Sequence, residues 1–260
     1  MIVRATPSSF ICIAQHAHAQ VSGQLAEHWQ LPYFEGVARR PEVLLAIREH
    51  DRAWIPLDAE PLWNEQAQAP HSFLDYPPAA RLQHYQKGIT EVEQQAPYAG
   101  LLCSLHYTSF PELAKHPLGL QFLAIEAERQ QRLKQELQLT DAAQTATLEF
   151  HKRLLRFADN LSLYLCLNEP GTSKAQEHPW YQAGIPFSDY FSFTHQQLVQ
   201  VEWPTRHQMH IRPSPFADAF AVSLRYQELP KARLTAVGLG QCFAETPVEE
   251  LEVWVHSGQA

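Results

Sequence analysis

The spacing of hydrophobic and polar positions divides the chain into a helical part and a strand-rich part. Before residue 168, apolar residues recur every three or four positions, which predicts α-helices. These helices are expected at residues 15–29, 41–54, 78–95, 97–110, 118–139 and 142–167. Residues 1–4 and 10–14 are apolar runs around a Thr-Pro-Ser-Ser turn, and they predict a β-hairpin at the N-terminus.

After residue 168 the helical spacing disappears, and proline, aromatic and β-branched residues become more frequent. Short apolar runs separated by proline or glycine predict β-strands here. They lie at residues 197–203, 208–212, 220–226, 234–237, 241–244 and 251–255. We therefore expect an α+β fold in two parts. Residues 1–168 form a mainly α-helical bundle with the hairpin, and residues 169–260 form an antiparallel β extension packed on it.

Residues 56–78 connect two helices without a clear period and are predicted to form a long ordered loop. Loops of this length are uncommon and are often functional. Trp54, Trp63, Phe73 and Tyr76 could close over a pocket. We favour the alternative, in which these aromatic side chains tie the loop to the core.

Composition limits the class of protein. The 260 residues are 45% hydrophobic, which is enough for one substantial core or two small domains. A net charge of -8 argues against a nucleic-acid-binding surface. Four cysteines without a C-x-x-C pair predict buried free thiols and a cytoplasmic location, and the absence of a long apolar run predicts no membrane association.

The helix at residues 41–54 carries an unusual polar residue. Leu44, Ile47, Asp51 and Trp54 fall on one helical stripe, so Asp51 places a carboxylate among apolar side chains. Such a carboxylate is costly unless it is paired or binds a metal. His50 beside it offers a second ligand, although Asp51 could instead cap a turn and His50 could be a core residue.

Three other helices also place a metal-capable side chain on their buried face: His18, His106 and Asp159. Helical bundles build metal sites from such residues on separate helices. Three histidines and two aspartates suit a divalent ion such as Mn, Fe, Zn, Co or Ni. An ion there would lower the pKa of a bound water and polarise a phosphoryl oxygen.

Motifs for other chemistries are absent. The chain has no G-x-S-x-G, P-loop or G-x-G-x-x-G sequence. Four arginines could contact a phosphate, although we expect each to be solvated: Arg52, Arg81, Arg153 and Arg156.

At the candidate ligands the chain resembles the HD-domain superfamily of metal-dependent phosphohydrolases. The resemblance rests on His18 in HAQVSGQLA, the EHD triplet ending at Asp51, His106 in LLCSLHYTS and Asp159 in FADNLSL. It covers residues 1–167 and implies an HD-like bundle with one or two ions. The glycine and lysine that often follow the His-Asp doublet in phosphodiesterase-type members are absent, and Arg52, Ala53 and Trp54 stand there instead, which argues against a cyclic-dinucleotide substrate. The whole chain also resembles a bacterial family of unknown function, through MIVR, HA-x-x-S-G-x-L-A, HD-x-x-W and D-x-L-S-L-Y-L.

These observations predict a metal-dependent hydrolase of a phosphate ester or nucleotide. By the resemblance, His18, His50, Asp51 and Asp159 bind the ion, and His106 is an extra ligand or lies near the phosphate. Asp51 and His106 are the candidate catalytic residues. One alternative is a di-iron oxygenase of the HD-like class, and another is a non-catalytic binding protein with a structural metal site. The expected partner is a small-molecule substrate, with a phosphorylated compound as the first candidate, and a homodimer is an open alternative.

Overall fold

The computed structural model of the chain describes residues 1–258, and it has an α+β fold. The α-helices are α1 Gln15–Glu27, α2 Arg40–Glu49, α3 Ile55–Ala59, α4 Pro78–Gln95, α5 Pro97–Tyr107, α6 Pro117–Glu136, α7 Ala142–Leu167 and α8 Lys231–Glu245. The strands are β1 Ile2–Ala5, β2 Ser9–Ile13, β3 Trp63–Asn64, β4 Ala69–Pro70, β5 Gln200–Thr205, β6 Gln208–Arg212, β7 Phe220–Pro230 and β8 Glu249–Ser257. The α+β class predicted from the sequence is therefore confirmed.

Prolines and one capping box set where the helices begin. Pro41, Pro78, Pro97 and Pro117 occupy the first or second position of α2, α4, α5 and α6. Proline suits this position because its missing N–H would be unpaired there. At α7, the Asp141 side chain accepts from a backbone N–H, and the side chain at N3 reaches back to the Asp141 N–H.

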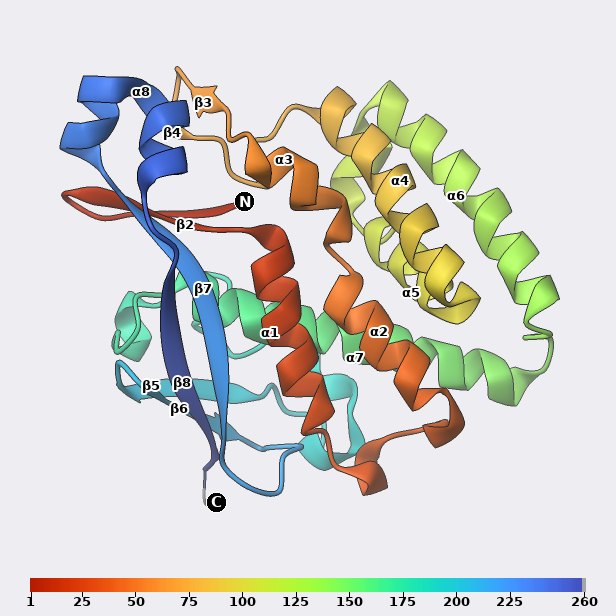
Figure 1. Ribbon diagram of the computed structural model, residues 1–260. Coiled ribbons are helices and arrows are strands. Elements are labelled where there is room, and N and C mark those ends of the chain that lie inside the picture. Colours follow the sequence, from red (N-terminus) through yellow and green to blue (C-terminus); the bar gives the residue numbers. More distant parts are fainter. Residues whose placement is uncertain (259–260) are drawn as a thin grey trace.

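Six strands form one sheet in the order β1-β2-β7-β8-β6-β5 (Figure 1). Strands β1 and β2 pair antiparallel, and β2 pairs with β7, with Phe10 opposite Leu229. The N-terminal strands and the C-terminal strands therefore share a single sheet. One hydrophobic core contains residues from both parts of the chain, such as Ile47, Leu154 and Val253. The domain boundary at residue 168 stays a prediction.

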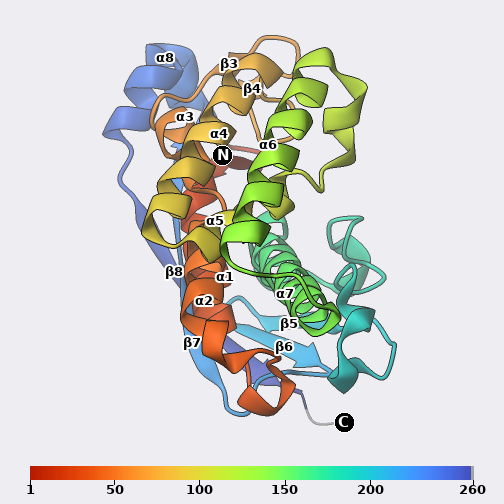
Figure 2. The same cartoon turned by 90° about the vertical axis from the view of Figure 1, so that its right-hand side faces the viewer.

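The helices form layers against this sheet. Helix α1 contacts β7, and α7 contacts β1. Helix α2 packs on α1 and on α7, and α5 packs on α2 and α7. Helices α4 and α6 lie outside α5, far from the sheet (Figure 1), and Figure 2 shows the helical layers turned toward the viewer. This packing brings parts of α1, α2, α5 and α7 together in the interior.

The prediction of strands at residues 234–237 and 241–244 is wrong, because these residues lie in α8. Its buried residues are Leu234 and Cys242, one on each side of Gly238. Gly238 has a φ of 77°, which interrupts the helix and made the two halves resemble short strands ended by glycine. The segments before and after Gly238 are both helical, and each carries one of the two buried residues.

The sequence predicts an antiparallel C-terminal extension, but one pair of its strands is parallel. Strand β8 pairs antiparallel with β7 but parallel with β6. The reason is topological: β6 and β7 run in opposite directions and β8 lies between them, so it must run parallel to one of the two.

The helix predicted at residues 41–54 is shorter than expected. Helix α2 ends at Glu49, and a 3₁₀ turn at Arg52–Trp54 leads into α3. Asp51, with φ -107° and ψ 21°, is outside helical geometry, and Pro56 starts the next helix. The loop predicted at residues 56–78 also contains most of α3 and the small β3–β4 ladder.

A membrane-spanning helix would need a long apolar stretch. None of the helices within residues 1–258 has the length and hydropathy required for that role.

Candidate metal centre

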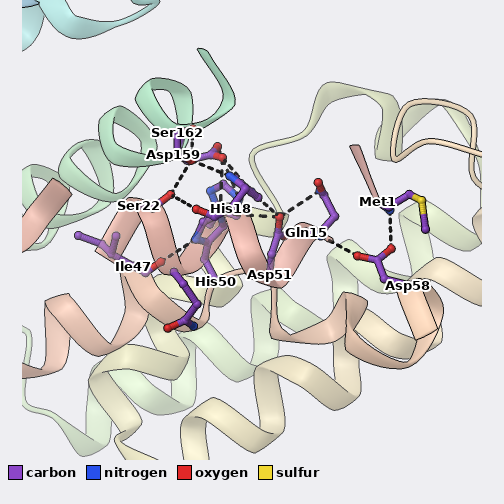
Figure 3. A network of polar contacts seen from close by, with 12 residues as sticks. Met1, Gln15, His18, Ser22, Ile47, His50, Asp51, Asp58, Asp159 and Ser162 are labelled. Atoms are coloured by element: carbon purple, nitrogen blue, oxygen red, sulfur yellow. Dashed lines mark hydrogen bonds and ion pairs between the residues drawn. The ribbon is translucent and has the colours of Figure 1, made fainter. Parts of the chain in front are cut away.

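The structure brings all five predicted site residues together in the interior of the helical layers. Figure 3 labels four of them: His18, His50, Asp51 and Asp159. His18 lies on α1, His106 near the end of α5 and Asp159 on α7. His50 and Asp51 immediately follow α2. All five are buried. Each of the helices α1, α5 and α7 therefore contributes one side chain to the cluster, and the end of α2 contributes the His50-Asp51 pair.

The end of α2 fixes the orientation of the His50 ring. The last carbonyls of a helix have no partner within the helix, and a histidine side chain can serve as their donor. His50 Nδ1 donates to the carbonyl oxygen of Ile47 at 2.7 Å. The Nε2 atom then points toward the carboxylates, is buried and has no hydrogen-bond partner in the described chain. Histidine ligands in metal sites are held in this way, with one nitrogen donating to the protein and the other free.

A serine pair fixes the His18 ring from the opposite side. Ser162 Oγ donates to the backbone oxygen of Asp159 at 2.9 Å. With its proton directed to that carbonyl, Ser162 Oγ can accept from His18 Nδ1, 2.6 Å away. Ser22 Oγ lies 2.7 Å from Ser162 Oγ, within hydrogen-bond distance (Figure 3). His18 Nε2 therefore faces Asp51 Oδ2, at 2.9 Å.

The ligand atoms surround one region of space. His18 Nε2 lies 3.7 Å from Asp159 Oδ1. His50 Nε2 lies 3.5 Å from the same oxygen and 3.8 Å from Asp51 Oδ2. His106 Nε2 is 4.0 Å from the other oxygen of Asp159, Oδ2. Two groups of three have ligand atoms within 4.8 Å of one another: His18, His50 and Asp51, and His50, His106 and Asp159.

These distances are compatible with an ion in either group of three, and the two groups share His50. Ligand atoms ~2.1 Å from an ion, at tetrahedral or octahedral angles, lie roughly 3.0–3.4 Å apart. The four separations between an imidazole of His18 or His50 and a carboxylate of Asp51 or Asp159 range from 2.9 to 3.8 Å. Two imidazole nitrogens and two carboxylate oxygens form a donor set for a borderline divalent ion. The buried cluster could therefore hold a metal.

Two neutral groups hold the Asp51 carboxylate in place. Gln15 Nε2 donates to Asp51 Oδ2 at 3.1 Å, and the Tyr107 hydroxyl donates to Oδ1 at 3.2 Å. The backbone N–H of Gln15 donates to Asp58 Oδ2 at 2.6 Å, and Asp58 Oδ1 pairs with the Met1 ammonium at 2.5 Å. Figure 3 shows this chain of contacts from Met1 to the cluster.

Charge compensation within the cluster shifts the pKa of its members in both directions. Burial alone would raise the pKa of Asp51 and Asp159, but the neighbouring imidazoles hold both below the usual range. Burial also opposes protonation of His50, but the carboxylates of Asp51 and Asp159 raise its pKa to about 9. Burial lowers the pKa of His106 to about 4, so this ring is neutral near pH 7.

The shift at His50 predicts proton release on metal binding. At pH 7.5 the metal-free chain carries a proton on His50, which a divalent ion must displace. The pKa of His50 in the folded chain is above its unfolded value of ~6.5. Protonation of His50 therefore stabilises the metal-free fold fully below pH ~6.5, and this stabilisation is lost as the pH rises through about 9. Titration calorimetry with Mn²⁺ in buffers of different ionisation enthalpy should give close to one released proton at pH 7.5 and fewer above pH 9. Heats that do not depend on the buffer at pH 7.5 would contradict this assignment.

A cavity of about 530 Å³ opens onto the cluster. His18, Asp51, His106 and Asp159 lie in its wall. Trp54, Phe73 and Tyr76, three of the aromatic residues predicted from the loop, also line it. Trp63 does not, and it packs instead on Phe10, with ring centroids 6.3 Å apart.

Sequence reasoning identified the five charged or imidazole groups but not the residues that orient them. Ser162, Ser22, Gln15 and Tyr107 were not singled out. A usable signal existed for Ser162, which lies three residues after Asp159 on the same face of α7. No comparable pattern marks Tyr107, because an aromatic residue near a helix end is usually explained by packing.

Comparison with known proteins gives one family match. The family model described as "Protein of unknown function (DUF3891)" matches residues 1–231, which include every residue of the cluster. No curated protein and no solved structure matches the chain. The resemblance to the HD-domain superfamily therefore stays a prediction. Because the match spans most of its 260 residues, the chain belongs to the DUF3891 family.

Proposed function

We propose that this chain is a metal-dependent hydrolase of a phosphate ester, with an HD-like helical core. The observation that carries the proposal is the buried and unpartnered Nε2 atom of His50. It faces two carboxylates, 3.5 Å from Asp159 and 3.8 Å from Asp51. A buried lone pair opposite two buried anions requires a cation between them, either a proton or a metal ion. The cavity beside the cluster gives a substrate access to that position.

The residues of the chain would divide the work as follows. His18, His50, Asp51 and Asp159 would hold the ion, and Gln15 and Tyr107 would keep Asp51 oriented. When bound, a divalent ion lowers the pKa of water and polarises a phosphoryl oxygen.

His106 has a separate place in the proposal. Its Nε2 atom lies 4.0 Å from Asp159 Oδ2, and both residues line the cavity. Its ring is neutral at pH 7, because burial lowers its pKa to about 4. A neutral imidazole can exchange hydrogen bonds with a water or a phosphate there.

The test measures metal content and phosphate release together. Protein purified without added metal is analysed by mass spectrometry, and p-nitrophenyl phosphate is then offered with Mn²⁺, Zn²⁺, Co²⁺, Ni²⁺ or Fe²⁺. We expect about one ion per chain and metal-dependent release of phosphate. His106→Ala should keep the ion and lose at least 10²-fold in rate, as removal of a general acid or base does. His28→Gln, on the exposed end of α1, is the control. A metal-loaded chain that hydrolyses no phosphate ester would refute the proposal.

The second candidate function is a di-iron oxygenase. It is favoured by the second group of ligands, in which the two oxygens of Asp159 face different imidazoles, His50 and His106. In this function Asp159, His50 and His106 would be among the residues that hold the two irons. Two irons per chain with a visible absorption band would support this function, and no bound metal would favour a non-catalytic role.

A further inference from the structure

The cavity beside the cluster has a chemically divided wall. Its inner end carries the carboxylates and imidazoles, and most of the remaining wall is apolar, formed by residues such as Trp54, Tyr85, Phe110 and Leu163. At about 530 Å³ it lies within the ~300–1,000 Å³ range of small-molecule sites. A substrate that fills it must combine an anionic end with a hydrophobic body.

Arg156 supplies a cation between these two regions. It lies on α7 one turn before Asp159, and both side chains line the cavity. Its guanidinium stacks 3.6 Å from the centroid of the Phe187 ring. Across residues 1–258 this guanidinium has no hydrogen bond or ion pair to a protein group. Because stacking uses only the face of the guanidinium, its N–H donors stay available in the plane for an anion. The sequence had instead predicted a solvated Arg156.

Exposed aromatic side chains line the outer part of the cavity. Phe187 is 51% exposed and Trp180 is 45% exposed, which is unusual for side chains of this size. Phe187 also has a φ of 61°, a left-handed conformation that is strained for a bulky residue. Trp180 meets Phe73, from the loop before α4, with ring centroids 6.4 Å apart. Two segments more than 100 positions apart thus place aromatic rings at one opening.

We infer that the substrate is a phosphate monoester with an aromatic or similarly flat apolar body. Arg156 binds its phosphate beside the metal centre, and Phe73, Trp180 and Phe187 pack against its body. Polar side chains such as Asp75, Ser109 and Glu112 also line the cavity, but aromatic and aliphatic side chains are more numerous there, so we expect apolar contact to hold the body of the substrate. The inference rests on the proposed function for the reaction, but the binding preference can be measured without turnover.

The experiment measures binding of phenylphosphonate and methylphosphonate, which are not hydrolysed. Both are titrated into the full chain, with and without Mn²⁺, by calorimetry and by tryptophan fluorescence. Phenylphosphonate should bind at least tenfold more tightly. Arg156→Gln should weaken both ligands by roughly 10- to 100-fold, as expected for loss of a charged hydrogen-bond donor. Trp180→Ala should weaken phenylphosphonate by about tenfold and leave methylphosphonate unchanged.

Arg153 provides the matched control one turn earlier on α7. It also stacks on an aromatic ring, that of Tyr190 at 4.1 Å, but it pairs with Glu149 at 2.7 Å and does not line the cavity. Arg153→Gln should leave the affinity for both ligands unchanged. Equal affinity for the two phosphonates, or equal loss in the Arg153 and Arg156 variants, would overturn the inference.

The two proposals fail in different ways. Hydrolysis of small alkyl phosphates as fast as aryl phosphates, with equal phosphonate binding, would overturn the inference and leave the hydrolase. Selective binding of phenylphosphonate through Arg156, without hydrolysis of any ester, would support the ligand class and refute the hydrolase.

Discussion

Replacing Asp51 with Asn should abolish metal uptake. Asp51 Oδ2 lies 2.9 Å from His18 Nε2 and 3.8 Å from His50 Nε2, so this oxygen belongs to the proposed coordination sphere. An amide keeps the shape but removes the charge that the ion requires, and loss of a carboxylate ligand is expected to cost more than 10²-fold in affinity. Mass spectrometry of the purified variant should find less than a tenth of the wild-type metal. The melting midpoint of the variant should no longer rise when Mn²⁺ is added, as it does for a protein whose native state alone binds the ion.

The same substitution separates metal binding from general damage to the core. Asn can still accept from Tyr107, so the metal-free variant should lose no more than ~1–3 kcal/mol, the cost of leaving the donor of Gln15 unpaired. Glu126→Gln is the control, because Glu126 is also a fully buried carboxylate but pairs with Arg129, away from the cluster. It should lower stability and keep the metal. Full metal occupancy in Asp51→Asn would remove the basis for a metal centre at this position.

The positions of the site residues could be predicted because they interrupt strong helical patterns. His18, His106 and Asp159 each occupy an apolar stripe of a helix, and Asp51 continues the stripe predicted for α2 although it lies just past the end of that helix. A buried polar group in such a position needs a partner. Four stripes with this property indicate one shared interior, since each helix of a small bundle contacts its neighbours. Periodicity within a single helix was therefore sufficient to nominate the cluster.

The state of each side chain could not be predicted in this way, because it depends on contacts between distant segments. The His18 ring is held by a hydrogen bond with Ser162, which is 144 positions away. Arg156 looked like a solvated cation, since only the path of the chain after α7 places Phe187 against it. Local spacing contains no information about either contact.

The C-terminal region shows the same limit for the fold. Glycines at 238 and 240 suggested strand ends, but the glycine at 238 breaks a helix that packs by Leu234 and Cys242. The parallel pairing of β6 and β8 follows from the insertion of β8 beside β7, which is a property of the whole sheet. The first error arises from the local backbone conformation of one glycine, and the second from the long-range arrangement of the sheet.

Adding a single methyl group at Gly88 should weaken both the fold and the metal centre. Gly88 is a buried residue of α4, and a Cβ there would lie 2.7 Å from the backbone N and Cα of Ala53. Ala53 belongs to the 3₁₀ turn that directly follows Asp51. The turn must therefore move, and overpacking of this kind costs about 1–3 kcal/mol. In a chain of this length, Gly88→Ala should lower the melting midpoint by roughly 3–10 °C.

The displacement should also reach Asp51, two residues before Ala53. Metal sites tolerate deviations of only about ±0.2 Å in ligand distance, so we expect Mn²⁺ affinity to fall by roughly tenfold in the folded variant. Gly240→Ala is the matched control, because a Cβ at this exposed position on α8 meets nothing within 4 Å. It should keep the affinity and leave stability unchanged or slightly raised, since alanine favours the helix over glycine. If calorimetry and melting curves of the Gly88 and Gly240 variants coincide, α4 does not hold the turn that carries Asp51.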